Sequence, residues 1–156
     1  MSLLNGKKPC FLAGTPVHTI NGLKPIEEIT KGEIVLCYDT ENKRLGQNVV
    51  SQVFNNITLK YLVITTTAGD VIKATGQHLF YLKRSDTWIK CYQLKVGMNL
   101  YDAQRDKLVK ITKLETIEEK VPTYNLEVEE LHNYLVGHTG LLSHNANKRP
   151  GYKSIT

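Results

Sequence analysis

The stretch KYLVITTTAGDVIKATGQHLFY, residues Lys60–Tyr81, decides the fold class of this chain. It is rich in β-branched and aromatic side chains, which are typical of strands. Ala68-Gly69-Asp70 interrupts the apolar run with residues that favour a tight turn. We therefore predict two strands joined at this turn, and a further strand that begins after the polar step Thr75–His78.

The rest of the chain repeats this pattern of short apolar runs between turns. Asn21-Gly22 lies between two extended runs and predicts a two-residue hairpin turn. One helical turn is expected before a strand from about Glu33 to Tyr38. The other short strands expected are NVVSQVFNN, HLFYLK, TWIKCYQL, GMNLYD, LVKITKLETI, PTYNLEV, NYLVG and TGLLSHN. No segment keeps a helical period over several turns, so we expect an all-β fold, without an internal repeat.

Length and composition fit one globular domain. The chain has 156 residues, of which 41% are hydrophobic and 22% charged. No apolar run approaches the roughly 20 residues of a membrane helix, and the first ten residues lack the apolar core of a signal peptide. We therefore expect no membrane partner. We also expect a monomer, and the cellular location stays open.

The net charge of +5 lies outside the middle of the chain. Residues 1–9 carry two lysines and residues 146–156 carry three basic residues, and neither segment has an acidic residue. Residues 10–145 therefore hold as many basic as acidic groups. A nucleic-acid surface needs clustered basic charge, which this neutral body does not have in excess. We predict no nucleic-acid partner, and a domain over residues 10–145 between flanking segments 1–9 and 146–156.

The three cysteines, Cys10, Cys37 and Cys91, do not form the CxxC pattern of zinc or redox sites. Cys37 and Cys91 lie in apolar runs and are expected to be buried. Cys10 stands where the neutral body begins and is the candidate nucleophile. Because an ordinary cysteine titrates near pH 8.5, it needs a base or a polarised target nearby.

Histidine is the usual partner of a nucleophilic cysteine, and the chain has five. His18, in a hairpin strand, is expected to be structural, and His138, in a loop, to be solvated. Thr75 and His78 form a T-x-x-H unit at a strand end, where both side chains can be directed at one peptide bond. Alone, this unit is a weak signal, and a hydrogen-bonded surface histidine is the more common explanation.

The closing stretch LLSHNAN contains a second reactive pair, His144-Asn145. An asparagine side-chain nitrogen can attack its own backbone carbonyl, which forms a succinimide and breaks the next peptide bond. Here that bond is Asn145-Ala146, and His144 can give the leaving amine its proton. Alone, the pair is also compatible with a polar strand end before a tail.

Four motifs in this order together resemble the Hint superfamily of inteins and Hedgehog-type domains. They are CFLAGTPV (Cys10–Val17), GDVIKATGQHLFY (Gly69–Tyr81), VPTYNLEVEELHNYLV (Val121–Val136) and GLLSHN (Gly140–Asn145). The final His-Asn pair is a feature of inteins and is lacking in Hedgehog-type domains. Because Ala146 follows it, the chain is similar to bacterial intein-like domains of the A type.

The resemblance implies an all-β, horseshoe-like fold that brings both ends of the domain to one site. It implies that Cys10 attacks the carbonyl of Pro9 and turns that amide into a thioester. His78 would protonate or polarise the Cys10 nitrogen, and Thr75 would hold the bond in place. An amide is more stable than a thioester, so this step needs strain and an oriented acid.

At the other end, the resemblance implies that Asn145 cyclises with help from His144 and His132, which takes the place of the histidine of the third motif. The partner is then the chain's own flanking segments, cut in cis, without a cofactor or a metal. A metal site formed by Cys10, His132 and His144 is the alternative at this point, and their spacing does not support it.

Three departures from the family pattern qualify the expectation. Ala146 stands where a splicing intein has Cys, Ser or Thr, so trans-thioesterification is lost, and cleavage or aminolysis by the Ala146 amine remains. Asn125 replaces an aspartate often found there, which leaves it a hydrogen-bonding role. Pro9 crowds the carbonyl that Cys10 must attack, so we expect slow N-terminal cleavage.

Two other classes of function stay open from the sequence. Cys10 and His78 could be the pair of a cysteine hydrolase that acts in trans on other proteins. The same fold could also be a catalytically inert, β-rich binding module. Turnover on an added peptide would favour the hydrolase, and a chain whose mass never changes would favour the inert module.

Overall fold

The computed structural model describes residues 9–144, so Asn145 and Ala146 lie outside the described residues. Its regular structure is β apart from two short 3-10 turns, which confirms the prediction of an all-β fold. The strands are β1 (Phe11–Leu12), β2 (Pro16–Thr19), β3 (Gly22–Pro25), β4 (Ile34–Asp39), β5 (Arg44–Thr66), β6 (Val71–Ala74), β7 (Leu79–Leu82), β8 (Thr87–Lys90), β9 (Asn99–Asp102), β10 (Lys107–Val128), β11 (Asn133–Val136) and β12 (Leu141–His144). The 3-10 turns are η2 (Ile26–Glu28) and η3 (Cys91–Gln93).

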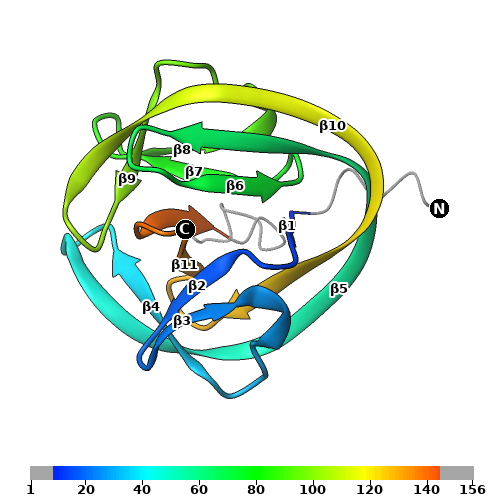
Figure 1. The fold of residues 1–156 in the computed structure, drawn as a ribbon. Helices are drawn as coiled ribbons and strands as arrows, with labels where there is room; N and C mark the ends of the chain where they lie inside the picture. Colours follow the sequence, from blue (N-terminus) through cyan, green and yellow to red (C-terminus); the bar gives the residue numbers. More distant parts are fainter. Residues whose placement is uncertain (1–8, 145–156) are drawn as a thin grey trace.

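Two long strands, β5 and β10, form the frame of the molecule and curve around the other strands (Figure 1). They pair antiparallel from Ile111 opposite Thr66 to Val128 opposite Val50. The expectation of several short strands was wrong here, because each long strand pairs with the other across its polar stretches as well as its apolar ones. Register shifts between Ile111 and Lys113 and between Glu118 and Val121 interrupt the ladder where the pair bends.

Two other details differ from the expected elements. The β2–β3 turn consists of Ile20 and Asn21, and Gly22 already pairs with Thr19. Gly22 has a φ of +104°, so glycine's conformational freedom is used at the start of β3. The expected strand TWIKCYQL ends at Lys90, and Cys91 begins η3.

The fold contains two similar units, contrary to the expectation that the chain has no internal repeat. One unit is β2–β3, η2 and the β4–β5 hairpin, and the other is β7–β8, η3 and the β9–β10 hairpin. In both hairpins an aspartate caps the turn. Asp39 accepts the backbone N–H groups of Glu41 and Asn42, and Asp102 accepts those of Gln104 and Arg105. The Tyr-Asp pairs at 38–39 and 101–102 were the available signal.

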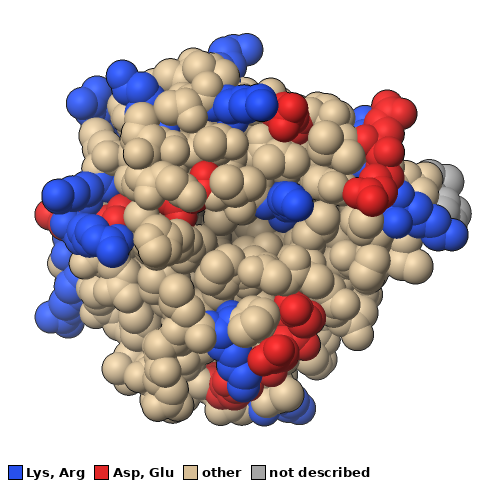
Figure 2. Space-filling model, in the orientation of Figure 1, with Lys and Arg blue, Asp and Glu red and all other residues tan. Residues whose placement is uncertain are grey.

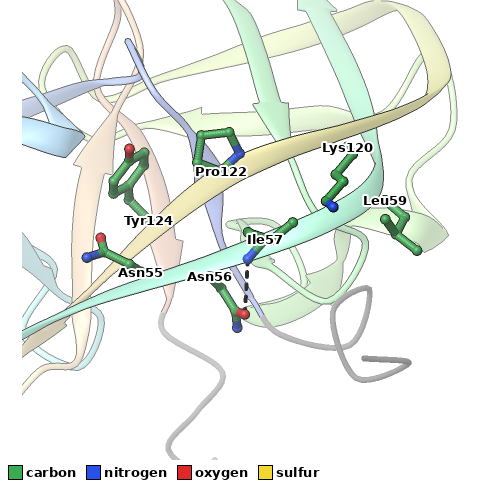
Figure 3. Close-up of a pocket in the computed structure, with 7 residues that line it drawn as sticks. All are labelled: Asn55, Asn56, Ile57, Leu59, Lys120, Pro122 and Tyr124. Carbon is green, nitrogen blue, oxygen red and sulfur yellow. Dashed lines mark hydrogen bonds between the residues drawn. The ribbon is translucent and has the colours of Figure 1, made fainter. Parts of the chain in front are cut away.

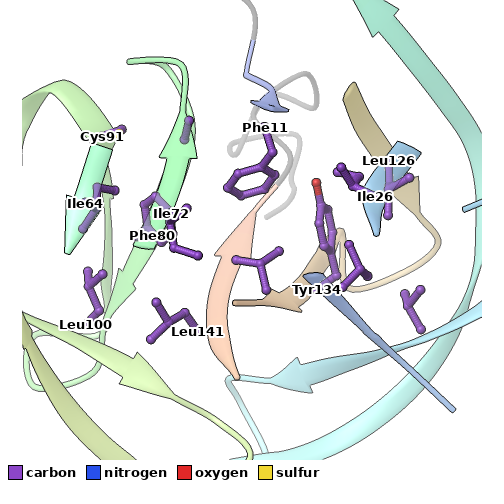
Figure 4. Close-up of a cluster of buried hydrophobic side chains, with 14 of the residues drawn as sticks. Phe11, Ile26, Ile64, Ile72, Phe80, Cys91, Leu100, Leu126, Tyr134 and Leu141 are labelled. Carbon is purple, nitrogen blue, oxygen red and sulfur yellow. The ribbon is translucent and has the colours of Figure 1, made fainter. Parts of the chain in front are cut away.

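The core lies inside the curve of β5 and β10 and draws on nearly every strand (Figure 4). Phe11, Phe80, Tyr134 and Leu141 are among its fully buried side chains. A smaller cluster forms around the aromatic residues Tyr38, Tyr81 and Tyr101. On the face in Figure 2, charged side chains of both signs lie mostly around the edge, and the middle is largely uncharged.

The predictions for the remaining cysteines and histidines are confirmed. Cys37 and Cys91 are fully buried, and burial raises the pKa of each thiol to about 12. His18 is buried, with its Nε2 atom 3.0 Å from the carbonyl oxygen of Gly137 and 2.9 Å from that of Thr139. His138 is exposed.

Candidate active site

Cys10 is held against Thr75 by its own backbone. The Cys10 N–H donates to Thr75 Oγ1 at 2.9 Å, and the Thr75 N–H donates to the Cys10 carbonyl oxygen at 2.9 Å. Thr75 Oγ1 in turn lies 3.3 Å from that same carbonyl oxygen, to which it donates. Pro9 and Cys10 are both buried. The peptide nitrogen between Pro9 and Cys10 is therefore fixed from one side by a threonine hydroxyl.

His78 lies one short turn away from Thr75, at the start of β7. The His78 N–H donates to the Thr75 carbonyl oxygen at 3.2 Å, and the Cys91 N–H donates to the His78 carbonyl oxygen at 2.7 Å. Its ring is fully buried and lies 3.9 Å from the Phe11 ring, centroid to centroid. Within residues 9–144, neither ring nitrogen of His78 has a hydrogen-bond partner. Burial, and then the charge of His144, lower the pKa of His78 to about 3.

Strand β12 brings the other end of the domain to the same place. His144 pairs with Leu79, which directly follows His78, and with Asn133 of β11. Its ring packs edge-on against Trp88 at 4.9 Å and lies 6.4 Å from the ring of His132. Cys10 and His144 therefore approach His78 from opposite ends of the described chain.

His132 lies in the turn between β10 and β11 with a φ of +57°, which is uncommon for a residue with a side chain. Burial lowers its pKa, and a hydrogen bond with the backbone of Val128 opposes that shift. Burial therefore favours the neutral form of the His132 imidazole, which lies close to His144.

Asn125 is buried and belongs to a contact that was not predicted from the sequence. Its Oδ1 atom accepts the Tyr134 hydroxyl at 2.7 Å and the Leu126 N–H at 2.8 Å. Tyr134 is fully buried, and its ring lies 6.1 Å from Phe11 and 6.4 Å from His78. The position of Tyr134, two residues after His132 in the third motif, was the only sequence feature that pointed to this contact.

The turn between β11 and β12, which sets the position of His144, is held by buried polar groups. Asp70 accepts the Thr139 N–H at 2.9 Å and the Thr139 hydroxyl at 2.6 Å. Asp102 accepts the Gly140 N–H at 3.1 Å. Both carboxylates are 1% exposed, so they hold the turn in a water-poor environment where such bonds are strong.

A family model, the pretoxin Hint domain, matches residues 16–146. The chain belongs to the Hint superfamily. The fold is that of inteins and intein-like domains, which supports self-processing as the general class of activity. A search of curated protein sequences found no match for this Hint domain.

Solved structures agree with this assignment. The bacterial intein-like domain from Clostridium thermocellum is 31% identical, with a TM-score of 0.82 over 87% of this chain and 98% of that one. The gp41-1 intein is 29% identical, with a TM-score of 0.73 over 88% of this chain and 98% of that one. A DnaB intein from Synechocystis, at 18% identity and a TM-score of 0.73 over 88% of this chain and 99% of that one, shares the fold.

This Hint domain also has features other than the candidate site residues. A shallow hollow of about 840 Å³ on the β5–β10 pair is lined by Asn55, Asn56, Ile57, Leu59, Lys120, Pro122 and Tyr124 (Figure 3). None of these is a candidate site residue. Residues 9–144 contain no group of three side chains suited to hold a metal ion. The described residues also include no helix long and apolar enough to cross a membrane.

Proposed function

We propose that this Hint domain cuts its own flanking segments in cis, with Cys10 as the N-terminal nucleophile. A bond forms between the Cys10 sulfur and the Pro9 carbonyl carbon, and the bond from that carbon to the Cys10 nitrogen breaks. The thiol proton ends on the freed amine, so the shift needs no other reactant. Water or an added thiol then cleaves the thioester and releases residues 1–9.

The hydrogen bonds between Thr75 and the Cys10 backbone are the observation that carries this proposal. The threonine hydroxyl contacts the nitrogen that must leave, and it orients that nitrogen toward one side of the peptide bond. His78 lies on the same turn, buried, with both ring nitrogens unpartnered within the described residues. A lowered pKa makes His78 a neutral imidazole, which relays a proton between sulfur and nitrogen without keeping it.

At the C-terminal end, the side-chain nitrogen of Asn145 attacks its own carbonyl carbon, and the Asn145-Ala146 bond breaks. The Ala146 amine gains the proton that the asparagine amide loses. His144 and His132 are the proposed proton carriers, since their rings lie 6.4 Å apart at the end of β12. Asn145 and Ala146 lie outside the described residues, so their part rests on the sequence.

Ala146 sets the balance between cleavage and splicing. Its methyl group cannot attack the Cys10 thioester, so the usual transfer between two nucleophiles is absent. Cleavage of each flank is the main outcome, and aminolysis of the thioester by the freed Ala146 amine gives a minor spliced product. The name of the pretoxin family makes a toxin sequence the kind of flanking cargo to look for.

The burial of Cys10 and His78 favours processing in cis over a hydrolase acting in trans. Cys10 is 2% exposed and His78 is fully buried. An external peptide would have to displace packed residues to reach either side chain, whereas the chain's own Pro9 is already in place.

Two substitutions test the proposal at its two ends. Cys10→Ala should abolish release of residues 1–9 and leave release of residues 146–156 largely intact. Asn145→Ala should do the reverse, and the wild-type C-terminal fragment should carry a succinimide or its hydrolysis product by mass spectrometry. Retained N-terminal cleavage in Cys10→Ala would overturn the mechanism.

A further inference from the structure

We propose that the Tyr134 hydroxyl is a further catalytic group at the N-terminal end, which donates a hydrogen bond to the Cys10 sulfur as it attacks. This inference rests on the proposed function. The resemblance to Hint domains implies no role for Tyr134, and the sequence predicts only a hydrogen-bonding role for Asn125.

The strand pairing brings Cys10 near Asn125, whose side chain binds the Tyr134 hydroxyl. Phe11 of β1 lies opposite Tyr124 of β10, so the residues before and after them, Cys10 and Asn125, are neighbours across the same antiparallel pair. Asn125 Oδ1 is 2.7 Å from the Tyr134 hydroxyl. Figure 4 shows the Tyr134 ring near Phe11, with its hydroxyl directed toward the Phe11 end of the core.

The surroundings make Tyr134 a donor and not a base. Burial, and then the negative charge of a Cys10 thiolate, raise the pKa of Tyr134 well above its ordinary value. The phenol therefore keeps its proton throughout the pH range in which the reaction runs.

The step that we assign to Tyr134 moves no net proton to or from it. In the resting state the hydroxyl donates to Asn125 Oδ1. As the Cys10 sulfur becomes negative, the hydroxyl turns to donate to it, and returns to Asn125 once the sulfur–carbon bond has formed. Asn125 is thus a positioning residue, because a neutral amide oxygen holds the hydroxyl without taking its proton.

Tyr134→Phe is a clean test because it leaves Asn125 satisfied. Asn125 Oδ1 keeps the Leu126 N–H at 2.8 Å after the hydroxyl is removed, so no acceptor is left buried without a donor. The matched control is Tyr101→Phe. Tyr101 is also buried, and its hydroxyl donates to Asp106 at 2.5 Å in the smaller aromatic cluster.

The experiment follows the whole chain by mass spectrometry after refolding from denaturant, with and without dithiothreitol to trap the thioester. Tyr134→Phe should slow thiol-dependent release of residues 1–9 at least about tenfold, since a hydrogen bond to a charged group is among the strong ones. Release of residues 146–156 should stay within about twofold of the parent. Tyr101→Phe should change neither rate by more than about twofold.

The outcomes separate this inference from the proposed function. A parent chain that releases neither flank refutes self-processing itself. A parent that cleaves normally, with Tyr134→Phe equally fast at its N-terminal end, refutes the role of Tyr134 alone. Equal slowing of both ends in Tyr134→Phe, with a lowered midpoint of thermal unfolding, would show a structural role and would also overturn the inference.

Discussion

At the scale of single residues, the environment of His78 is costly to the fold and useful to the proposed chemistry. A fully buried imidazole whose nitrogens have no partner among residues 9–144 gives up hydration without recovering it. Such a group is a strong candidate for a functional site, because ordinary packing would favour an apolar side chain there. The lowered pKa of His78 is the measurable consequence.

That lowered pKa makes stability depend on pH in a defined direction. The pKa of His78 is about 3 in the fold and about 6.5 when unfolded. The unfolded chain therefore binds the extra proton between these values, and stability falls as the pH drops below 6.5. Between pH 7 and pH 5 the loss from His78 should be about 2 kcal/mol.

Urea unfolding checks this in a chain that carries Cys10→Ala and Asn145→Ala, so that it stays intact. The same chain with His78→Gln is the control, which leaves the contribution of His132 in place. The free energy of unfolding should fall by about 2 kcal/mol more in the parent than in the control. Identical pH dependence in both would mean that His78 is not held neutral by the fold.

Pro9 gives a second prediction at this scale. Its ring crowds the carbonyl carbon that Cys10 attacks, and it is buried, so it has little room to turn away. Pro9→Ala should therefore release residues 1–9 faster in the presence of dithiothreitol. Equal initial rates for the two chains would show that the proline ring is no obstacle.

At the scale of elements, the turn between β11 and β12 links the core to the C-terminal end of the site. Asp70 binds Thr139, Asp102 binds Gly140, and His18 lies against the carbonyl oxygens of Gly137 and Thr139. These groups come from three separate parts of the chain. β12 follows this turn directly and ends at His144. A substitution that loosens the turn should therefore slow release of residues 146–156 more than release of residues 1–9.

Two glycines, Gly32 and Gly137, allow the cost of backbone strain to be measured separately from the cost of disturbing this packing. Gly32 and Gly137 both have positive φ, +99° and +92°. A Cβ at Gly32 would meet nothing within 4 Å, whereas one at Gly137 would lie 2.7 Å from Asp70 Oδ1 and 3.0 Å from Ile72 Cδ1. The Asp70 side chain cannot move away from such a Cβ without weakening its hydrogen bonds to Thr139.

Gly32→Ala should therefore cost about 1 kcal/mol of unfolding free energy, from backbone strain alone. Gly137→Ala should cost about 2 kcal/mol more, since a buried contact must give way. Denaturation curves measure both, and Gly137→Ala should also slow release of residues 146–156 more than thiol-dependent release of residues 1–9. Equal costs for the two alanines would argue against the tight packing of the turn.

At the scale of the whole molecule, β5 and β10 form a curved frame around the shorter strands. They connect the two similar hairpin units, and the short β1 pairs with β10 and β6 inside their curve. The ends of the described chain meet at the β6–β7 turn because both are held by strands that this frame encloses. A domain built this way brings the first and last described residues to the turn that carries His78.

The strands and the T-x-x-H unit could be predicted because β-branched runs and turn residues are local signals. The Ala68–Asp70 turn and the strand before Asp39 are examples. The length of β5 and β10 could not be predicted. Polar residues such as Asn55 and Asn56 stay in strand conformation because they pair with residues far away in the sequence. The approach of Tyr134 to Asn125 depends on how β11 packs against β10, which no local pattern encodes.

The most direct test of self-processing is a mass-spectrometric time course of the unmodified chain, refolded at several protein concentrations with and without dithiothreitol. We expect loss of residues 1–9 that the thiol accelerates, loss of residues 146–156, and rates that are first order and independent of dilution. Masses that never change, or cleavage that slows on dilution, would contradict the account.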